Sequence, residues 1–363
     1  MKAGIVGLPN VGKSTLFNCL SNTKAQSANF PFCTIEPNIG IISVPDKRLE
    51  NLEKLVNPEK VIPATVEIVD IAGLVKGASK GEGLGNQFLA NIRETDAIIH
   101  VLRCFDDDNI VHVEGSIDPI RDKEIIDLEL QLKDLETVEK RRDKIARLIK
   151  TGNKEAIAEN TLLIKLINHL HSFKPVRSLD FFDKEKILID TMQLITNKPV
   201  LYICNVDESS AVVGNSHVDK IKMVIEEENS EFIILAVDIE ADINELDTYE
   251  DRQVFLSDIG LSEPGSSKMI RKAYNLLNLQ TYFTAGVKEV RAWTILKGMS
   301  APQAAGVIHT DFEKGFIKAE VISYSNYIKF GSESKAREVG KLKIEGKDYI
   351  VNDGDIMHFR FNI

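Results

Sequence analysis

The stretch GLPNVGKST, residues 7–15, decides the fold, because it fits the phosphate-binding pattern G-x-x-x-x-G-K-[ST] at every fixed position. An apolar run, residues 3–6, precedes it, and a helical pattern, residues 14–20, follows it. Glycines let successive backbone N–H groups turn inward around phosphate, and the N-terminus of the following helix favours an anion. The order of strand, glycine loop and helix therefore predicts an α/β nucleotide-binding domain.

The chemistry of phosphate binding assigns roles within this loop. Lys13 is expected to reach the β- and γ-phosphates, and the hydroxyl of Ser14 is expected to ligate Mg²⁺. Asn10 is a polar candidate for holding a monovalent cation, such as K⁺, beside the phosphates. The residues predicted to line the phosphates are Pro9, Asn10, Val11, Gly12, Lys13, Ser14 and Thr15.

A second strand, within VEIVDIAG at residues 66–73, ends in a candidate metal-binding carboxylate. Asp70 is placed to hold the Mg²⁺ shell, through a water molecule, and a backbone N–H at Gly73 can contact the γ-phosphate. Between this strand and the glycine loop lies NFPFCTIEPN, residues 29–38, where Thr34 is the natural second Mg²⁺ ligand. The order of these elements predicts a Mg²⁺-nucleotide site with two switch segments.

The residue after Gly73 is Leu74, where many enzymes of this type have a Gln that orients the attacking water. Leucine neither donates nor accepts a hydrogen bond, so another group must position the water, or turnover is slow without a partner. His112, in a polar loop after the apolar strand at residues 97–102, is one candidate. The alternative for a lone loop histidine is a solvated side chain without a catalytic role. The predicted catalytic residues are therefore Lys13 and His112, with Leu74 in the place of the glutamine.

The base-reading element is predicted at NVDE, residues 205–208, where an apolar run ends. In G-type nucleotidases this turn reads N-K-x-D, and its Asp accepts two hydrogen bonds from guanine. Here Val206 stands for Lys and Glu208 for Asp, and both changes weaken guanine recognition, so adenine is the expected base. The loss can matter greatly, because a site built on base hydrogen bonds can discriminate between two bases by about 10⁴. Asn197-Lys198 resembles the same motif but precedes the strand, at the wrong end of a parallel sheet. The predicted base-binding residues are Asn205, Val206, Glu208, Ala236 and Val237.

The segment from residue 123 to about residue 170 has the apolar spacing of amphipathic helices. Within it, Thr151-Gly152-Asn153 follows a first run, residues 123–150, and precedes a second, residues 161–170, which predicts an antiparallel helical hairpin. Its basic residues favour either RNA contact or a solvated helix face. They gather near the predicted tip and are Lys140, Arg141, Arg142, Lys144, Arg147 and Lys150.

The last part of the chain changes character near residue 280, where short β-like runs alternate with polar turns. A helix is expected at residues 301–309, and Asp353-Gly354 is expected to form a hairpin turn. We expect a small α+β domain of about 85 residues. It holds no catalytic constellation and is predicted to be a recognition module.

Composition limits the classes of protein to which the chain can belong. The net charge of −10 argues against coating of nucleic acid by bulk attraction, so a polyanion would be met by a local patch. No apolar run approaches the roughly 18 residues of a membrane span. The N-terminus leaves no room for a signal peptide, and four cysteines without CxxC spacing predict reduced thiols in the cytoplasm.

Together GLPNVGKST, FPFCTIEPN, DIAGLVKGASKGEGLGN, the NVDE turn and the C-terminal module resemble the YchF or Obg-like ATPase family, along essentially the whole chain. The resemblance implies a TRAFAC-class P-loop NTPase of α/β fold, with an Obg-type G domain at residues 1–122 and 200–279. It implies a coiled-coil helical insertion at residues 123–199. At residues 280–363 it implies a TGS domain of β-grasp, ubiquitin-like fold.

The same resemblance implies hydrolysis of ATP in preference to GTP, with a loop histidine at the position of His112 as a catalytic residue. The residues themselves predict Mg²⁺ as the cofactor and slow turnover. It also implies association with the ribosome or RNA, through the helical insertion and the TGS domain, in the cytoplasm and without a membrane. Two alternatives stay open. One is a GTPase of the same fold. The other is a nucleotide-bound adaptor for RNA or the ribosome with little catalytic role.

Overall fold

The computed structural model describes residues 1–21, 38–71 and 84–362, and the chain divides into two compact units. Of the described residues, the first unit holds 1–21, 38–40, 67–71 and 84–269. The second unit holds residues 41–66 and 270–362. These units follow packing alone, and the domain limits at residues 123, 200 and 280 stay a prediction.

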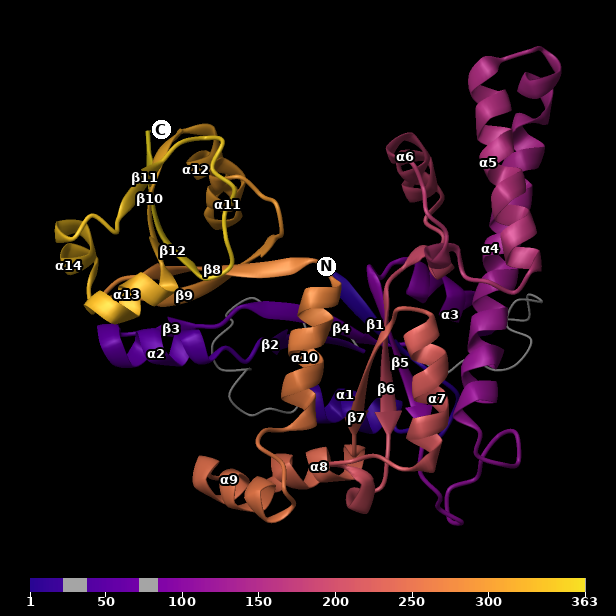
Figure 1. Cartoon of the computed structure of the whole chain (residues 1–363), viewed down its shortest axis with the longest axis horizontal. Coiled ribbons are helices and arrows are strands. Elements are labelled where there is room, and N and C mark those ends of the chain that lie inside the picture. Colours follow the sequence, from indigo (N-terminus) through magenta and orange to yellow (C-terminus); the bar gives the residue numbers. More distant parts are fainter. Residues whose placement is uncertain (22–37, 72–83, 363) are drawn as a thin grey trace. The chain divides into compact units, whose positions relative to one another are not determined.

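The first unit holds most of a sheet of six described strands in the order β2-β4-β1-β5-β6-β7 (Figure 1). Neighbouring pairs from β4 to β7 are parallel. Every residue of β5 and β6 is buried, as expected for central parallel strands covered on both faces. The carboxyl ends of such strands meet at one edge, where ligands bind. The strands are β1 (Lys2–Val6), β2 (Ile39–Ser43), β4 (Thr65–Asp70), β5 (Ala97–Arg103), β6 (Val200–Asn205) and β7 (Glu231–Leu235).

The helices of the first unit alternate with these strands, as in other α/β proteins. Asn244 of α8 donates from Nδ2 to the carbonyl oxygen of Cys19 in α1 at 2.9 Å, which joins two helices near the glycine loop. The last helix, α10, begins in this unit and ends in the second. The helices outside the insertion are α1 (Lys13–Ser21), α3 (Leu84–Arg93), α7 (Ser216–Glu227), α8 (Val237–Glu245), α9 (Tyr249–Asp258) and α10 (Gly265–Leu276).

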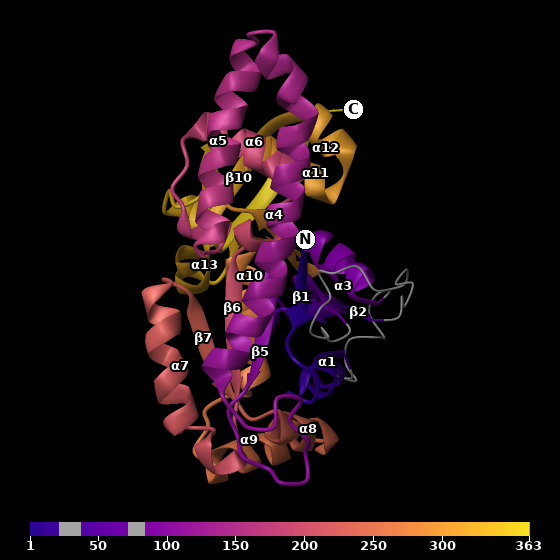
Figure 2. The ribbon, with the colours of Figure 1, turned by 90° about the vertical axis from the view of Figure 1, so that its right-hand side faces the viewer.

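The expected helical hairpin is present, formed by α4 (Pro119–Lys150) and α5 (Lys154–His171), which lie side by side in Figures 1 and 2. Asp118 caps α4 by accepting hydrogen bonds from two backbone N–H groups, and Asn153 caps α5 in the same way with one. The two helices share an apolar core that includes Val138, Leu163 and Leu166. Both helices begin earlier than their apolar spacing indicates, because a capping residue, not an apolar one, sets each start.

The chain returns from the hairpin to the sheet through short elements. Asp134 of α4 is fully buried and accepts from the backbone N–H groups of Ile195 and Thr196 at 2.8 and 2.7 Å, which fixes the segment before β6. Burial raises the pKa of this carboxyl group, and the hydrogen bonds oppose the shift. The return elements are the 3₁₀ turn η2 (Val176–Ser178), α6 (Asp183–Met192) and the 3₁₀ turn η3 (Ile195–Asn197).

The second unit contains a mixed sheet of six described strands in the order β11-β10-β12-β8-β9-β3. β8 and β9 form an antiparallel hairpin, β12 is parallel to β8, and α11 packs on the sheet through a shared apolar core. The order β11-β10-β12-β8-β9, with α11 between β9 and β10 in the chain, is the β-grasp arrangement. The strands are β3 (Val61–Ile62), β8 (Leu279–Ala285), β9 (Val290–Leu296), β10 (Phe316–Ser323), β11 (Lys343–Glu345) and β12 (Asp355–Phe361). The helices are α2 (Lys47–Val56), α11 (Ala301–Ile308), α12 (Thr310–Lys314), α13 (Tyr324–Phe330) and α14 (Glu333–Glu338).

The predicted hairpin turn at Asp353-Gly354 is wrong, because β12 pairs with β10 and β8, and not with the residues before the turn. Ile350 instead forms an isolated bridge with Ser300. Asp353 accepts from the backbone N–H of Thr281 at 3.0 Å and forms an ion pair with Arg48 at 2.7 Å.

Among the helices that the structure describes, none has the length and apolar character needed to cross a membrane.

Candidate nucleotide-binding site

The glycine loop connects β1 to α1 and is shaped by two glycines that have no room for a side chain. A Cβ on Gly7 would lie 2.5 Å from the carbonyl oxygen of Val101. Gly12 has φ +95°, and a Cβ there would lie 2.6 Å from Nδ2 of Asn205. Helix α1 starts at once, with the N–H of Leu16 donating to the carbonyl oxygen of Gly12 at 2.9 Å. The loop thus brings the N-terminus of a nine-residue helix to the carboxyl edge of the sheet.

Lys13 is buried, and its ammonium group donates to the carbonyl oxygen of Leu8 at 2.6 Å. Burial lowers the pKa of Lys13 to about 8, and the attraction of Asp70 opposes that shift. A nearby anion would stabilise this buried cation, because an opposite charge favours the protonated form of lysine. The local chemistry therefore fits an anionic group beside Lys13.

Ser14 and Asp70 face one another across the start of α1. The Ser14 hydroxyl donates to Oδ2 of Asp70 at 3.2 Å. The other carboxylate oxygen, Oδ1, is buried and has no hydrogen-bond partner among the residues that the structure describes. A buried carboxylate oxygen without a donor is costly, and oxygen ligands of this kind suit Mg²⁺. Ser14 and Asp70 therefore fit a magnesium ion, while the predicted partners Thr34, Gly73 and Leu74 lie outside the described residues.

Asn205 ends β6 and joins the glycine loop to the start of α8. Its Nδ2 donates to the carbonyl oxygen of Val11 at 3.0 Å, and its Oδ1 accepts from the N–H of Val237 at 3.0 Å. The side chain is buried, so both ends of the amide are used inside the protein. Three predicted site elements, the glycine loop, Asn205 and Ala236-Val237, are thus brought together by one side chain.

The remaining residues of the NVDE turn differ in exposure. Val206 is buried, and its N–H donates to the carbonyl oxygen of Leu235 at 3.0 Å. Asp207 accepts from the Ser209 hydroxyl, which lowers the pKa of that carboxyl group. Glu208 is exposed and begins the 3₁₀ turn η4 (Glu208–Ser210). Its carboxylate therefore remains available to a ligand at the end of the turn.

Lys198, in the motif that precedes β6, has a different position. Its ammonium group donates to the carbonyl oxygens of Ile92 at 2.6 Å and Arg93 at 2.7 Å, and also to that of Thr95. Lysine at this place caps the carboxyl end of α3, and burial lowers its pKa to about 8.

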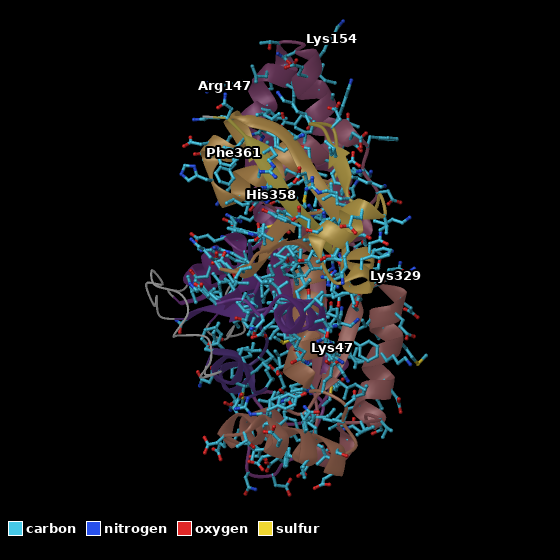
Figure 3. The ribbon with its side chains drawn as sticks, turned by 90° about the vertical axis from the view of Figure 1, so that its left-hand side faces the viewer. Lys47, Arg147, Lys154, Lys329, His358 and Phe361 are labelled. Atoms are coloured by element: carbon cyan, nitrogen blue, oxygen red, sulfur yellow. The ribbon has the colours of Figure 1, made fainter. Side chains whose placement is uncertain are left out.

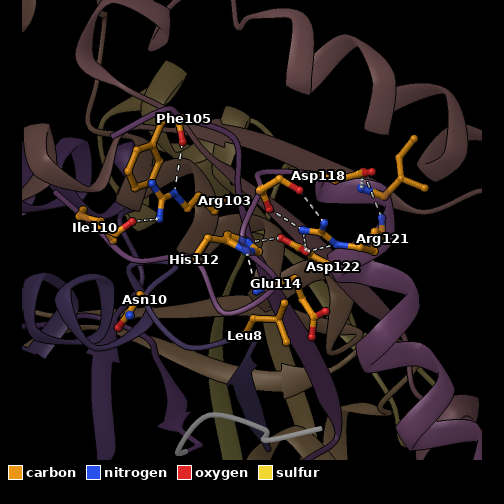
Figure 4. A network of polar contacts seen from close by, with 12 residues as sticks. Leu8, Asn10, Arg103, Phe105, Ile110, His112, Glu114, Asp118, Arg121 and Asp122 are labelled. Atoms are coloured by element: carbon orange, nitrogen blue, oxygen red, sulfur yellow. Dashed lines mark hydrogen bonds and ion pairs between the residues drawn. The ribbon is translucent and has the colours of Figure 1, made fainter. Parts of the chain in front are cut away.

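The loop that carries His112 leaves β5 at Arg103, which is almost fully buried (Figure 4). The guanidinium of Arg103 donates to the carbonyl oxygens of Phe105, Asp107 and Ile110 at 3.2, 3.0 and 2.9 Å. Asn10 of the glycine loop donates from Nδ2 to the carbonyl oxygen of Val111 at 3.2 Å. The loop is therefore held from inside by Arg103 and touches the glycine loop next to His112.

His112 is not a solvated bystander, because its side chain is 6 % exposed and both ring nitrogens have partners. Nε2 lies 2.8 Å from Oδ2 of Asp122 in α4, and Nδ1 accepts from the N–H of Glu114 at 3.1 Å. Sequence analysis missed Asp122 and Arg103 as partners in this region. The Asp118-Pro119 helix start was a local signal for the position of Asp122, but no sequence signal indicated its approach to His112.

Two family models match the chain. Residues 2–146 match a family described as a 50S ribosome-binding GTPase, and residues 279–362 match the YchF-GTPase C-terminal family, described as a protein of unknown function. The chain is 53 % identical over 365 residues to a protein of Bacillus subtilis (strain 168) named ribosome-binding ATPase YchF, with 100 % of both chains covered. It is 54 % identical over 362 residues to the Escherichia coli O157:H7 protein of that name, covering 100 % of this chain and 99 % of the relative.

A solved structure described as "Structure of the Schizosaccharomyces pombe YchF GTPase" superposes with a TM-score of 0.91 at 40 % identity. The match covers 99 % of this chain and 97 % of the solved one. Full-length identity above half and a shared fold along the whole chain leave one assignment. The chain belongs to the YchF family.

Proposed function

We propose that this chain binds ATP with Mg²⁺ and hydrolyses it slowly, as a switch that associates with the ribosome or RNA. The observation that carries the proposal is the Ser14–Asp70 pair, at 3.2 Å, beside the buried ammonium of Lys13. The names of the relatives, which describe them as ribosome-binding ATPases, support the same activity and partner.

Phosphate binding begins with the glycine loop, whose backbone N–H groups and helix end attract the triphosphate. Lys13 exchanges its bond to the Leu8 carbonyl oxygen for the β- and γ-phosphate oxygens, and stays protonated beside them. Ser14 and Asp70, with Thr34 as the predicted third group, would hold Mg²⁺, which when bound would neutralise charge on those oxygens. Gly73 is proposed to contact the γ-phosphate through its N–H, and Asp70 to act through a water molecule.

Base selection falls to the turn after β6. Asn205 uses both ends of its amide within the protein, so it shapes the pocket next to Ala236 and Val237. Val206 is buried and lacks the long stem with which a lysine would cover a base. Glu208 keeps a carboxylate at the motif's last position but adds a methylene, which moves the charge from where guanine needs it. We infer that guanine loses its advantage and that ATP is preferred.

Water positioning falls to His112, because Leu74 has no group that orients water. The loop of His112 touches the glycine loop through Asn10 and Val111, which keeps the imidazole within the same region as the phosphates. A histidine that must move before it acts agrees with slow turnover of the isolated protein.

A second candidate is a GTPase of the same fold. The exposed carboxylate of Glu208 favours it. So does the word GTPase, which appears for both matching families and for the solved Schizosaccharomyces pombe relative. A third candidate is an adaptor for RNA or the ribosome with little catalytic role. Exposed basic residues at the hairpin tip favour that role, and Figure 3 labels two of them, Arg147 and Lys154.

The experiment that separates enzyme from adaptor is phosphate release from ATP by the Lys13→Ala variant. We expect turnover to fall to background, since Lys13 is the cation proposed to hold the transferred phosphate. Lys184→Ala, which removes an exposed lysine of α6, is the matched control and should behave as the unaltered chain. If Lys13→Ala kept both its ribosome binding and its function in the cell, the adaptor would be the better description.

A further inference from the structure

We propose that Asp122 is the positioning residue of His112. It holds the imidazole against the first turn of α4, in a conformation in which both ring nitrogens have protein partners, and we call this the stored position. His112 begins to orient water when the contact with Asp122 breaks. The inference rests on the proposed role of His112 in hydrolysis, and it adds the group that controls that role.

The hydrogen bonds of the ring define the stored position (Figure 4). A backbone N–H can only donate, so Nδ1 of His112, which accepts from Glu114 at 3.1 Å, carries no proton. In the neutral ring the proton is then on Nε2, which donates to Oδ2 of Asp122 at 2.8 Å. With both nitrogens used and the side chain 6 % exposed, neither nitrogen is available to a water molecule.

Asp122 is itself held on several sides. Its side chain is 2 % exposed, and Oδ1 accepts from Nη2 of Arg121 at 2.9 Å. Arg121 is anchored in turn, because it also donates to the carbonyl oxygen and hydroxyl of Ser116 at 2.5 and 2.9 Å. Asp122 also lies in the first turn of α4, where the helix dipole attracts an acidic side chain. A hydrogen bond to a charged group changes the ratio of bonded to unbonded conformations by on the order of 10- to 100-fold, so most molecules have His112 in the stored position.

The rest of the loop limits how His112 can be released. Arg103 fixes the carbonyl oxygens of residues 105, 107 and 110, and Asn10 holds that of Val111. The backbone before His112 is thus tied down, so release requires a change at the ring itself or at the start of α4. Helix α4 runs without interruption for 32 residues, and Arg147 near its end lies about 38 Å along the helix from Asp122. A partner that bound at the tip would therefore contact the same continuous helix that holds His112.

The first test is spectroscopic and does not depend on activity. In ¹⁵N NMR of the full chain, the His112 signal, assigned by its loss in His112→Gln, is expected to show the Nε2–H tautomer. In Asp122→Asn the signal should shift toward the tautomer mixture of an exposed histidine. Glu124→Gln removes a carboxylate from the exposed side of the same helix and should leave the signal unchanged. A tautomer mixture in the unaltered chain would overturn the proposal.

The second test is the turnover of ATP by the isolated chain. Asp122→Asn is expected to raise kcat severalfold with KM unchanged, and the gain should vanish in the double variant with His112→Gln. Unchanged or lower kcat in Asp122→Asn would overturn the proposal, since it would mean that the contact does not restrain His112. If His112→Gln alone left kcat unaltered while the NMR signature held, the failure would lie with the catalytic role of His112.

Discussion

The side-chain amide of Asn205 joins the carbonyl oxygen of Val11 to the backbone N–H of Val237, at 3.0 Å in each direction. One buried side chain thus connects the loop proposed to hold the phosphates with the helix end proposed to lie near the base. The two halves of the pocket are held in register by an internal bond, and not by the nucleotide.

Asn205→Ala should destabilise the first unit, because it leaves a buried carbonyl oxygen and a buried N–H without partners. Each unmade bond costs about 1–3 kcal/mol, so we expect the free energy of unfolding to fall by about 2–6 kcal/mol. Urea denaturation followed by circular dichroism measures it. Asn168→Ala, at an exposed position of α5, is the control. If the free energy of unfolding fell no further than in the control, the hydrogen bonds of Asn205 to Val11 and Val237 would not stabilise the fold.

The pKa of Lys13, lowered to about 8 by burial, makes nucleotide binding sensitive to pH. A bound triphosphate raises that pKa, because an anion stabilises the ammonium form. The affinity for nucleotide should therefore weaken as pH rises from 7 through about 8, and binding at higher pH should take up a proton. Titration calorimetry in buffers of different ionisation enthalpy measures that uptake. Lys13→Arg keeps its charge throughout this range, so its uptake should vanish; equal uptake in both proteins would assign the proton to another group.

Removing the charge of Asp70 should separate metal binding from nucleotide binding. In Asp70→Asn the affinity for Mg²⁺ in the presence of nucleotide is expected to fall about 10–100-fold, as for other residues that support a bound metal. Binding of nucleotide in EDTA should change far less, because Lys13 and the loop remain. Fluorescent nucleotide displacement at varied Mg²⁺ concentration gives both numbers. An equal loss with and without Mg²⁺ would point to a folding defect.

The hairpin tip should carry part of the affinity for the ribosome. Lys144 and Arg147 are exposed and have no ion pair among the described residues, whereas Lys140 and Arg141 pair with Glu136 and Glu159. Replacing Lys144 and Arg147 by Glu is expected to weaken cosedimentation with ribosomes, most strongly at low salt.

The matched control for the tip is the double replacement of Lys220 and Lys222 by Glu, on the exposed side of α7. It changes net charge by the same amount at another place. ATP binding should survive both double variants. If the two bound ribosomes equally well, the tip would be a solvated face.

Much of the fold could be predicted from local signals. The glycine loop predicts its strand and helix, and the apolar spacing predicts the hairpin. The apolar spacing places both helix starts too late, whereas Asp118-Pro119 and Asn153 are start signals in the sequence that match the observed caps. The turn at Asp353-Gly354 was misread, because a local turn pattern does not reveal which distant strand a strand will pair with.

The contacts within the site were harder to predict. The sequence indicated that Asn205 lies at a strand end, but not that its amide turns inward to Val11 and Val237. The pairing of His112 with Asp122 depends on a loop returning to the first turn of a helix ten residues later, and no periodicity encodes that approach. Tertiary contacts of this kind leave no local pattern in a single sequence from which they could be predicted.

The central expectation for this protein is that its pocket accepts a Mg²⁺-triphosphate without requiring guanine. Titration calorimetry of the purified chain with non-hydrolysable analogues of ATP and GTP, each with Mg²⁺, tests it directly. We expect the ATP analogue to bind more tightly, by about tenfold or more. Equal or tighter binding of the GTP analogue would contradict it.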